Sequence, residues 1–199
     1  MRNKLDLVVL VADKDAEVGF RALLRRHRDL RTKPLSFDVF RGPMHDPAVY
    51  RYCHHFLRDY QRTYSRTLVV FDREGSGAED LEASELEREV EERLGKNGWL
   101  QRCAALVLDP ELEAWVWLDS AVLARHLRIS RERLREILGE AKPKDPKAQL
   151  EKIWREKGIR RSSAFYQALA QEVNFHTCRD RAFRKFLRVL RTWFPTTAN

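Results

Sequence analysis

The run from Leu5 to Ala12 is the feature that most restricts how this chain can fold. Seven of its eight residues are apolar, and three of those are valine. Such a run is typical of a strand buried on both faces, as in a parallel sheet covered by helices on its two sides. It ends at Asp13 with no cleavage site after it. It therefore predicts a first strand and not a signal peptide.

Strand and helix patterns then alternate along the first part of the chain. Further strands are expected at residues 35–40, 67–71 and 104–108. Helices are expected at residues 16–27 and from two Asp-Pro pairs, Asp46-Pro47 and Asp109-Pro110, which suit helix starts. A further helix is expected to contain Leu86, Val90 and Leu94 and to end at Gly95 and Gly98. This order predicts an α/β fold with a mainly parallel four-stranded sheet flanked by helices.

After Trp117 the strand pattern stops, and helices are expected at residues 130–138, 146–156, 162–173 and 180–194. We therefore predict an α/β core at residues 1–119 and a basic helical extension at residues 120–199 that packs on the core. The extension holds 19 Lys or Arg against 8 Asp or Glu. Such a charge asymmetry is typical of proteins that contact nucleic acid. It is also typical of helices whose basic faces are simply solvated.

Cysteine usage and hydropathy narrow the setting of the protein. The chain has three cysteines, widely spaced and without a CxxC pair, so neither a disulfide framework nor a zinc site is indicated. No apolar run approaches the roughly 18 residues needed to cross a bilayer. We expect a cytoplasmic protein without membrane contact.

Acidic residues follow three of the four predicted strands. They are Asp13, Asp15 and Glu17 after the first strand, Asp72 and Glu74 after the third, and Asp109, Glu111 and Glu113 after the fourth. In open parallel sheets, ligands bind beyond the carboxyl ends of the strands. Carboxylates that converge there repel one another unless a cation neutralises them, and oxygen ligands of this kind favour Mg²⁺ or Mn²⁺.

Helix capping explains some of these acids equally well. Asp109 before Pro110 suits a helix N-cap, with Glu111 and Glu113 in the first turn, where the helix dipole favours them. Asp13 or Asp15 could cap the first helix in the same way. Asp72 and Glu74 have no evident capping duty, so we rank them with Asp13 as the main candidates. Glu17, Asp109, Glu111 and Glu113 are weaker ones.

Other motifs give weaker indications of function. The pair His54-His55 on a predicted helix is typical of surface or packing positions, and Trp115 and Trp117 are typical of a core or an interface. No HExxH, Walker A or GxGxxG motif is present, and Ser76 lacks the strand–elbow–helix setting of a hydrolase nucleophile.

Several segments, spread over most of the chain, resemble a known family. The acid at the end of the first strand and the DxD-like Asp72-Arg73-Glu74 resemble the Toprim domain of topoisomerases, primases and nucleases of the overcoming-lysogenization-defect type. The segment from Pro110 to Trp115, followed by Leu118-Asp119, resembles small Toprim-like proteins encoded beside ATPases in bacterial defence islands. The nearest resemblance is to the small Toprim-like component of methylation-associated defence systems.

The resemblance implies a Toprim-like fold, a divalent metal and a role against phage or other foreign DNA. By position, Asp13 matches the family's general-base glutamate, and Asp72 and Glu74 match its metal-binding aspartates. Two departures stand out: Asp13 is shorter than the usual Glu, and Glu74 replaces the usual Asp. Both departures bear on whether the domain is catalytic.

Two functions therefore stand open, both as a component of a defence system. The first is a Mg²⁺- or Mn²⁺-dependent nuclease in which Asp13, Asp72 and Glu74 hold the metal. Basic residues would hold the DNA backbone: Lys142, Lys144, Lys147, Arg184 and Arg188. The alternative is a non-catalytic adaptor that docks on an ATPase or another defence subunit through the Trp-rich segment and the acidic helix at residues 79–92. A phosphatase or nucleotide-processing enzyme could use the same crevice.

Overall fold

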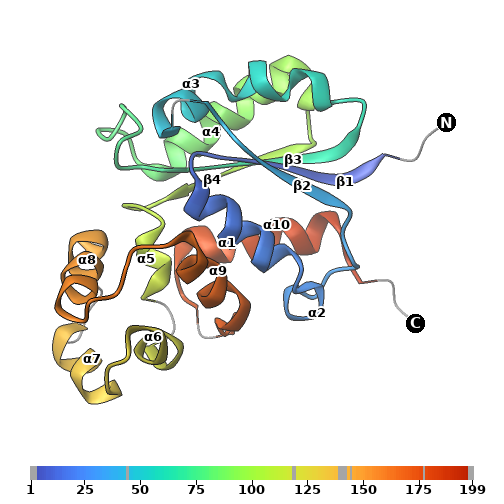
Figure 1. Cartoon of the computed structure of the whole chain (residues 1–199). Helices are drawn as coiled ribbons and strands as arrows, with labels where there is room; N and C mark the ends of the chain where they lie inside the picture. Colours follow the sequence, from blue (N-terminus) through green and yellow to red (C-terminus); the bar gives the residue numbers. More distant parts are fainter. Residues whose placement is uncertain are drawn as a thin grey trace.

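A four-stranded, wholly parallel sheet forms the centre of the molecule (Figure 1). The computed structural model describes residues 4–43, 45–117, 120–138, 143, 145–176 and 178–196. The strands are β1 (Leu5–Val11), β2 (Phe37–Arg41), β3 (Tyr64–Asp72) and β4 (Cys103–Leu108), in the spatial order β2-β1-β3-β4. The predicted α/β fold with a parallel sheet is thus confirmed.

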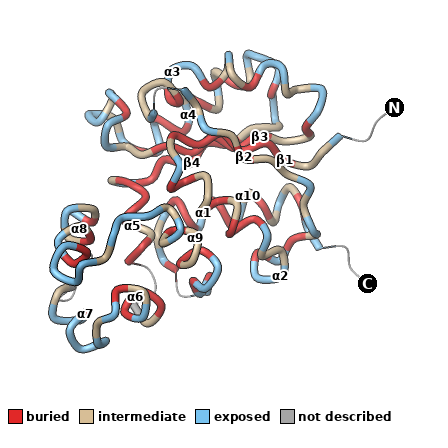
Figure 2. Tube along the Cα trace, in the orientation of Figure 1, coloured by how far each residue is buried: buried red, intermediate tan, exposed pale blue. Residues whose placement is uncertain are grey.

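Helices cover both faces of the sheet (Figure 1). One face carries α3 (His45–Leu57), the short turn η1 (Arg58–Tyr60), α4 (Ala83–Leu94) and the turn η2 (Gly95–Trp99). The other face carries α1 (Lys14–Leu24), α2 (His27–Leu30), α9 (Ser163–Glu172) and α10 (Arg181–Trp193). Figure 2 shows that burial is concentrated in the strands and in the sides of the helices that face them.

Side-chain alternation in β1 divides the core in two. Val8 and Leu10 join the cluster under α3 and α4, whereas Leu7, Val9 and Val11 join the cluster that contains α1, α9 and α10. All five are at most 1% exposed. Since successive side chains of a strand point to opposite faces, a strand covered on both sides must be apolar throughout, which accounts for the sequence of this run.

The remaining helices lie toward the carboxyl ends of the strands (Figure 1). They are α5 (Glu113–Val116), α6 (Ser120–Leu127), α7 (Arg131–Leu138) and α8 (Pro146–Glu156). The helical C-terminal region is confirmed, and it includes α6, which the sequence pattern did not predict. Phe20, Trp154 and Phe186 belong to one hydrophobic cluster, so both parts of the chain share a core. The division at residues 119 and 120 stays a prediction.

Among the described residues, no helix combines the length and the apolar character that a membrane span requires.

The helix expected to begin at Asp109-Pro110 begins later. Helix α5 starts at Glu113, and Leu112 occupies its N-cap position without a side-chain cap. The reason is that the backbone beyond β4 continues beside β3. The N–H of Arg73 donates to the carbonyl oxygen of Leu108, and that of Glu74 to the carbonyl of Pro110, both at 2.9 Å. Asp109 therefore caps no helix, and that part of the capping interpretation is wrong, whereas Glu113 does lie in the first turn of α5 as expected.

Candidate metal centre

The strand order fixes where a ligand site is expected. Strands β1 and β3 are neighbours, but the chain leaves β1 toward β2 on one side and leaves β3 toward β4 on the other. In open α/β sheets, the crevice beyond the carboxyl ends of two such strands is the usual binding position. Asp13 lies two residues beyond the end of β1, and Asp72 is the last residue of β3.

Three carboxylates converge at this edge. Asp72, Glu111 and Glu113 each offer one oxygen, and these oxygens all lie within 4.8 Å of one another. Oxygen ligands lie about 2.0–2.6 Å from Mg²⁺ or Ca²⁺, so two ligands on opposite sides of one ion are about 4–5 Å apart. The donor set therefore fits a single divalent cation. We call Asp72, Glu111 and Glu113 the carboxylate triad.

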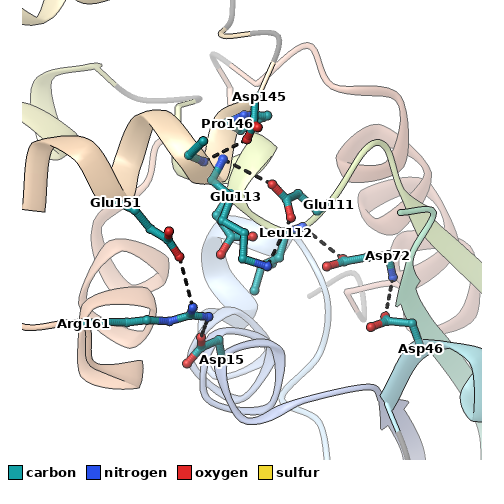
Figure 3. A network of polar contacts seen from close by, with 12 residues as sticks. Asp15, Asp46, Asp72, Glu111, Leu112, Glu113, Asp145, Pro146, Glu151 and Arg161 are labelled. Atoms are coloured by element: carbon teal, nitrogen blue, oxygen red, sulfur yellow. Dashed lines mark hydrogen bonds and ion pairs between the residues drawn. The ribbon is translucent and has the colours of Figure 1, made fainter. Parts of the chain in front are cut away.

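One backbone hydrogen bond brings the two segments of the triad together. The N–H of Leu112 donates to Oδ1 of Asp72 at 3.0 Å, so the loop after β4 is tied to the end of β3 (Figure 3). The Leu112 side chain is buried in the core. Glu111 and Glu113 flank this anchor, and both are buried at 5% and 4% exposure. Buried carboxylates are rare unless they are paired or bind a metal.

Two further acids border the triad. The backbone N–H of Asp72 donates to Oδ1 of Asp46, in the first turn of α3, at 2.8 Å (Figure 3). Asp13, Asp46 and Asp72 line a small cavity of about 10 Å³. A space of that size holds about one water molecule or ion. Asp46 was not among the predicted site residues, because the pair Asp46-Pro47 is typical of a helix start. It could have been found by applying to β2 the rule that ligands bind beyond the carboxyl ends of strands.

The crowding of acids perturbs their ionisation. Burial raises the pKa of Asp72 well above its usual value, and the neighbouring charges of Asp46, Glu113, Asp13 and Glu111 raise it further. Burial also raises the pKa of Asp46 and of Glu111, against the opposing effect of Lys147 on Glu111. The ionised forms of these carboxyl groups are thus disfavoured in the protein without a metal. A bound divalent cation would remove this cost.

The C-terminal helices complete the site. Tyr166 of α9, itself buried, donates its hydroxyl to Oε1 of Glu113 at 2.6 Å. At the start of α8, the N–H of Lys147 donates to Oε1 of Glu111 at 3.2 Å, and its Nζ lies 3.5 Å from Oε2. Burial, and then the charge of Glu113, raise the pKa of Tyr166 so that it stays a hydrogen-bond donor. No sequence pattern indicated that Tyr166 would reach a carboxylate 53 positions away.

The acids after β1 are engaged locally. Asp13 caps α1 by accepting from the N–H of Ala16 at 2.8 Å, and it also lines the small cavity beside Asp72. The capping role is confirmed, and a role at a metal stays a prediction. Asp15 accepts from Arg161 at 3.2 Å (Figure 3). It also accepts from the hydroxyl of Ser163. Glu17 pairs with three cations: Lys14, Arg21 and Arg41.

The acids after β3 and β4 divide between the triad and the surface. Glu74 is exposed, and its charge contributes to the raised pKa of Glu111, but it is not a member of the triad. Asp109 is also exposed and pairs with Arg73 at 3.3 Å. The triad therefore joins Asp72 with two residues that ranked as weaker candidates. A catalytic set of Asp13, Asp72 and Glu74 stays a prediction.

The predicted nucleic-acid contacts fall in three places. Lys142 and Lys144 lie outside the described residues, as does Asp119. Lys147 lies against Glu111, beside the triad. Arg184 and Arg188 are exposed on α10. Their contact with DNA stays a prediction.

No family model matches the chain, and neither a curated protein nor a solved structure was found that is significantly similar to it.

Proposed function

We propose that this protein is a divalent-metal-dependent nuclease that hydrolyses DNA phosphodiester bonds. The observation that carries the proposal is the convergence of Asp72, Glu111 and Glu113 within 4.8 Å at the carboxyl edge of the sheet. Carboxylates are the ligands that Mg²⁺ and Mn²⁺ prefer, and these ions serve phosphoryl-transfer chemistry more than any other protein-bound cations.

The residues around the triad suit this chemistry. When bound, a divalent ion would polarise a phosphoryl oxygen and lower the pKa of water. Asp72, Glu111 and Glu113 would hold it. Asp13, half-buried and next to Asp72 in the small cavity, is placed to accept a proton from water. Lys147 lies at the edge of the triad with its side chain 44% exposed, and it can contact a phosphate oxygen.

The Toprim resemblance supports the same proposal and extends it. Asp13 and Asp72 stand where the family has its general base and its first metal ligand, and Glu111 and Glu113 belong to the segment that resembles small proteins of defence islands. We therefore propose a role in restricting phage or other foreign DNA, with an ATPase among its partner subunits.

The adaptor alternative loses one of its arguments. The indoles of the Trp-rich segment are engaged within the protein: Trp117 is 5% exposed and donates its Nε1–H to the carbonyl of Pro146, and Trp115 packs against Phe20 and Phe183. They therefore offer little surface to a partner, and docking through this segment stays a prediction.

The test measures cleavage of labelled single- and double-stranded DNA with Mg²⁺, Mn²⁺ or a chelator. Asp72→Asn, Glu111→Gln and Glu113→Gln should each reduce cleavage about 100-fold or more and weaken Mn²⁺ binding measured by calorimetry. Asp109→Asn is the matched control, because it changes an exposed neighbour outside the triad. Circular dichroism and thermal melting establish that each variant folds. If Asp72→Asn cuts as fast as the parent, the proposal is wrong.

A further inference from the structure

An open groove lies beside the carboxylate triad. Its volume is about 760 Å³, within the usual range of ligand-binding sites. Its walls come from the turn between β1 and α1, the loop between β2 and α3, the α3 residue Phe56, and Arg161 before α9. The groove therefore begins at the carboxyl ends of β1 and β2, on the side of the sheet edge away from β4.

Three half-exposed cations border the groove. The side chains of Lys14, Arg41 and Arg161 are 52%, 55% and 49% exposed. They are held in place by acids: Nζ of Lys14 lies 3.0 Å and Nε of Arg41 lies 3.1 Å from Oε2 of Glu17. Among the contacts of the described residues, the two terminal nitrogens of the Arg41 guanidinium make none, so they can bind an anion from solvent.

The charge of one part of the rim favours an anionic ligand. Glu17 is a single carboxylate paired with three cations, because Arg21 lies 3.2 Å from its Oε1. The rim around Glu17 therefore carries an excess of positive charge, whereas Asp13 and Asp15 line the inner wall and Asp15 pairs with Arg161. Fixed cations on a pre-positioned rim recognise phosphate oxygens at little entropic cost.

The groove and the triad share a wall. Asp13 lines the groove and also the small cavity that reaches Asp72. Phe56 adds a half-buried aromatic ring to the lining. A basic rim beside an aromatic ring suits single-stranded nucleic acid, in which cations contact the backbone and a ring contacts a base.

We propose that this groove binds one strand of nucleic acid and leads its phosphodiester backbone to the carboxylate triad. The groove is open to solvent, so a polymer can extend out of it. The cleavage step rests on the proposed nuclease function, whereas strand binding does not require it. This assignment places the principal phosphate contacts on Lys14 and Arg41, near the sheet edge, and not on α10.

The test is fluorescence anisotropy with a fluorescein-labelled single-stranded oligonucleotide, in a chelator so that no cleavage occurs. Arg41→Glu should raise the Kd about 10-fold or more, and Arg41→Gln should raise it less and lower the slope of log Kd against log salt by about one. Arg188→Glu tests the competing position on α10. Arg88→Glu, the same charge change at an exposed residue of α4, is the control and should bind like the parent. Circular dichroism checks the fold of all four variants.

Three results would overturn the inference. Parental affinity in both Arg41 variants would show that the groove does not hold the strand. A larger loss in Arg188→Glu than in Arg41→Glu would place the strand on α10. A duplex of the same length could bind as tightly as the single strand or more tightly, and Arg41→Glu could weaken both to the same extent. In that case the groove would bind a duplex and not a single strand. Groove-dependent binding with no metal-dependent cleavage would instead refute the nuclease proposal and leave the groove standing.

Discussion

Glu87 of α4 and Arg181 of α10 form a double hydrogen bond, at 2.8 and 3.0 Å, that closes the open edge of the sheet. Oε1 of Glu87 also accepts from the backbone N–H of Val107 at 3.0 Å, and Arg181 donates to the carbonyl of Val107 at 3.1 Å. Strand β4 is an edge strand, so these side chains satisfy backbone groups that would otherwise invite pairing with another chain. Acidic residues of α4 thus form ion pairs with basic residues of α10.

Glu87→Ala should therefore destabilise the fold by about 2–3 kcal/mol, because it leaves the Val107 N–H and the Arg181 guanidinium without their partner. Denaturant unfolding measures this change. Glu92→Ala on the same helix removes an exposed ion pair with Arg88 and should change the free energy of unfolding by less than about 0.5 kcal/mol. Equal effects of the two substitutions would contradict the role of Glu87 at the strand edge.

Asp72→Asn should stabilise the metal-free protein at neutral pH. Because the folded-state pKa of Asp72 is raised above its usual 3.8, the stability that this group contributes is present below that value. It is lost as pH rises through the raised pKa. In a chelator, the parent should melt at a lower temperature at about pH 8 than at about pH 5.5, and Asp72→Asn should reduce this difference. Added Mn²⁺ should raise the melting temperature of the parent more than that of the variant. A pH profile unchanged by the substitution would contradict the raised pKa.

Tyr166→Phe should weaken Mn²⁺ binding about 10-fold, since hydrogen bonds to metal-binding carboxylates orient them. The chain offers a matched control: Tyr64 donates to Asp38 at 2.6 Å, the same distance as Tyr166 to Glu113, but at the start of β3, the opposite end of that strand from Asp72. Tyr64→Phe should leave Mn²⁺ affinity unchanged. Calorimetry of both variants separates orientation of Glu113 from a general loss of stability, and equal losses of affinity would argue against a positioning role.

Trp115→Ala should cost about 3 kcal/mol of stability. The indole packs against Phe20 and Phe183 at centroid distances of 5.5 and 4.9 Å, and its Nε1–H donates to Asp180 at 2.9 Å. Tyr52→Ala, at a side chain that is 57% exposed, should change stability by less than about 0.5 kcal/mol. A stable Trp115→Ala protein that failed only to bind a partner subunit would restore the adaptor hypothesis.

Local patterns were enough to predict the strands and most helices. The apolar runs that became β1, β3 and β4 are strand-length segments covered on both faces, and helix α8 begins at Pro146 after its Asp145 cap, as expected. These features depend on neighbours in sequence, such as alternation along a strand and capping at a helix end, so they can be read without knowing the fold.

The site depended on longer distances. Asp72 was predicted from its place at a strand end, but Glu111 and Glu113 were assigned to the first turn of a helix capped by Asp109, whereas α5 begins only at Glu113. Their contact with Asp72 follows from the pairing of the chain beyond β4 with β3, which no local pattern encodes. The hydrogen bond from Tyr166 is of the same kind, since it requires α9 to pack beside α1.

The sequence by itself thus determined a parallel α/β sheet with acids at its carboxyl edge, because burial on two faces and the positions of strand ends are local properties. Which acids meet was decided only by the tertiary structure. The strand order puts the ends of β1 and β3 side by side, and the loop after β4 carries Glu111 and Glu113 to Asp72. Convergence of charge depends on the path of the whole chain, and the cost of that convergence is offset by packing elsewhere in the core.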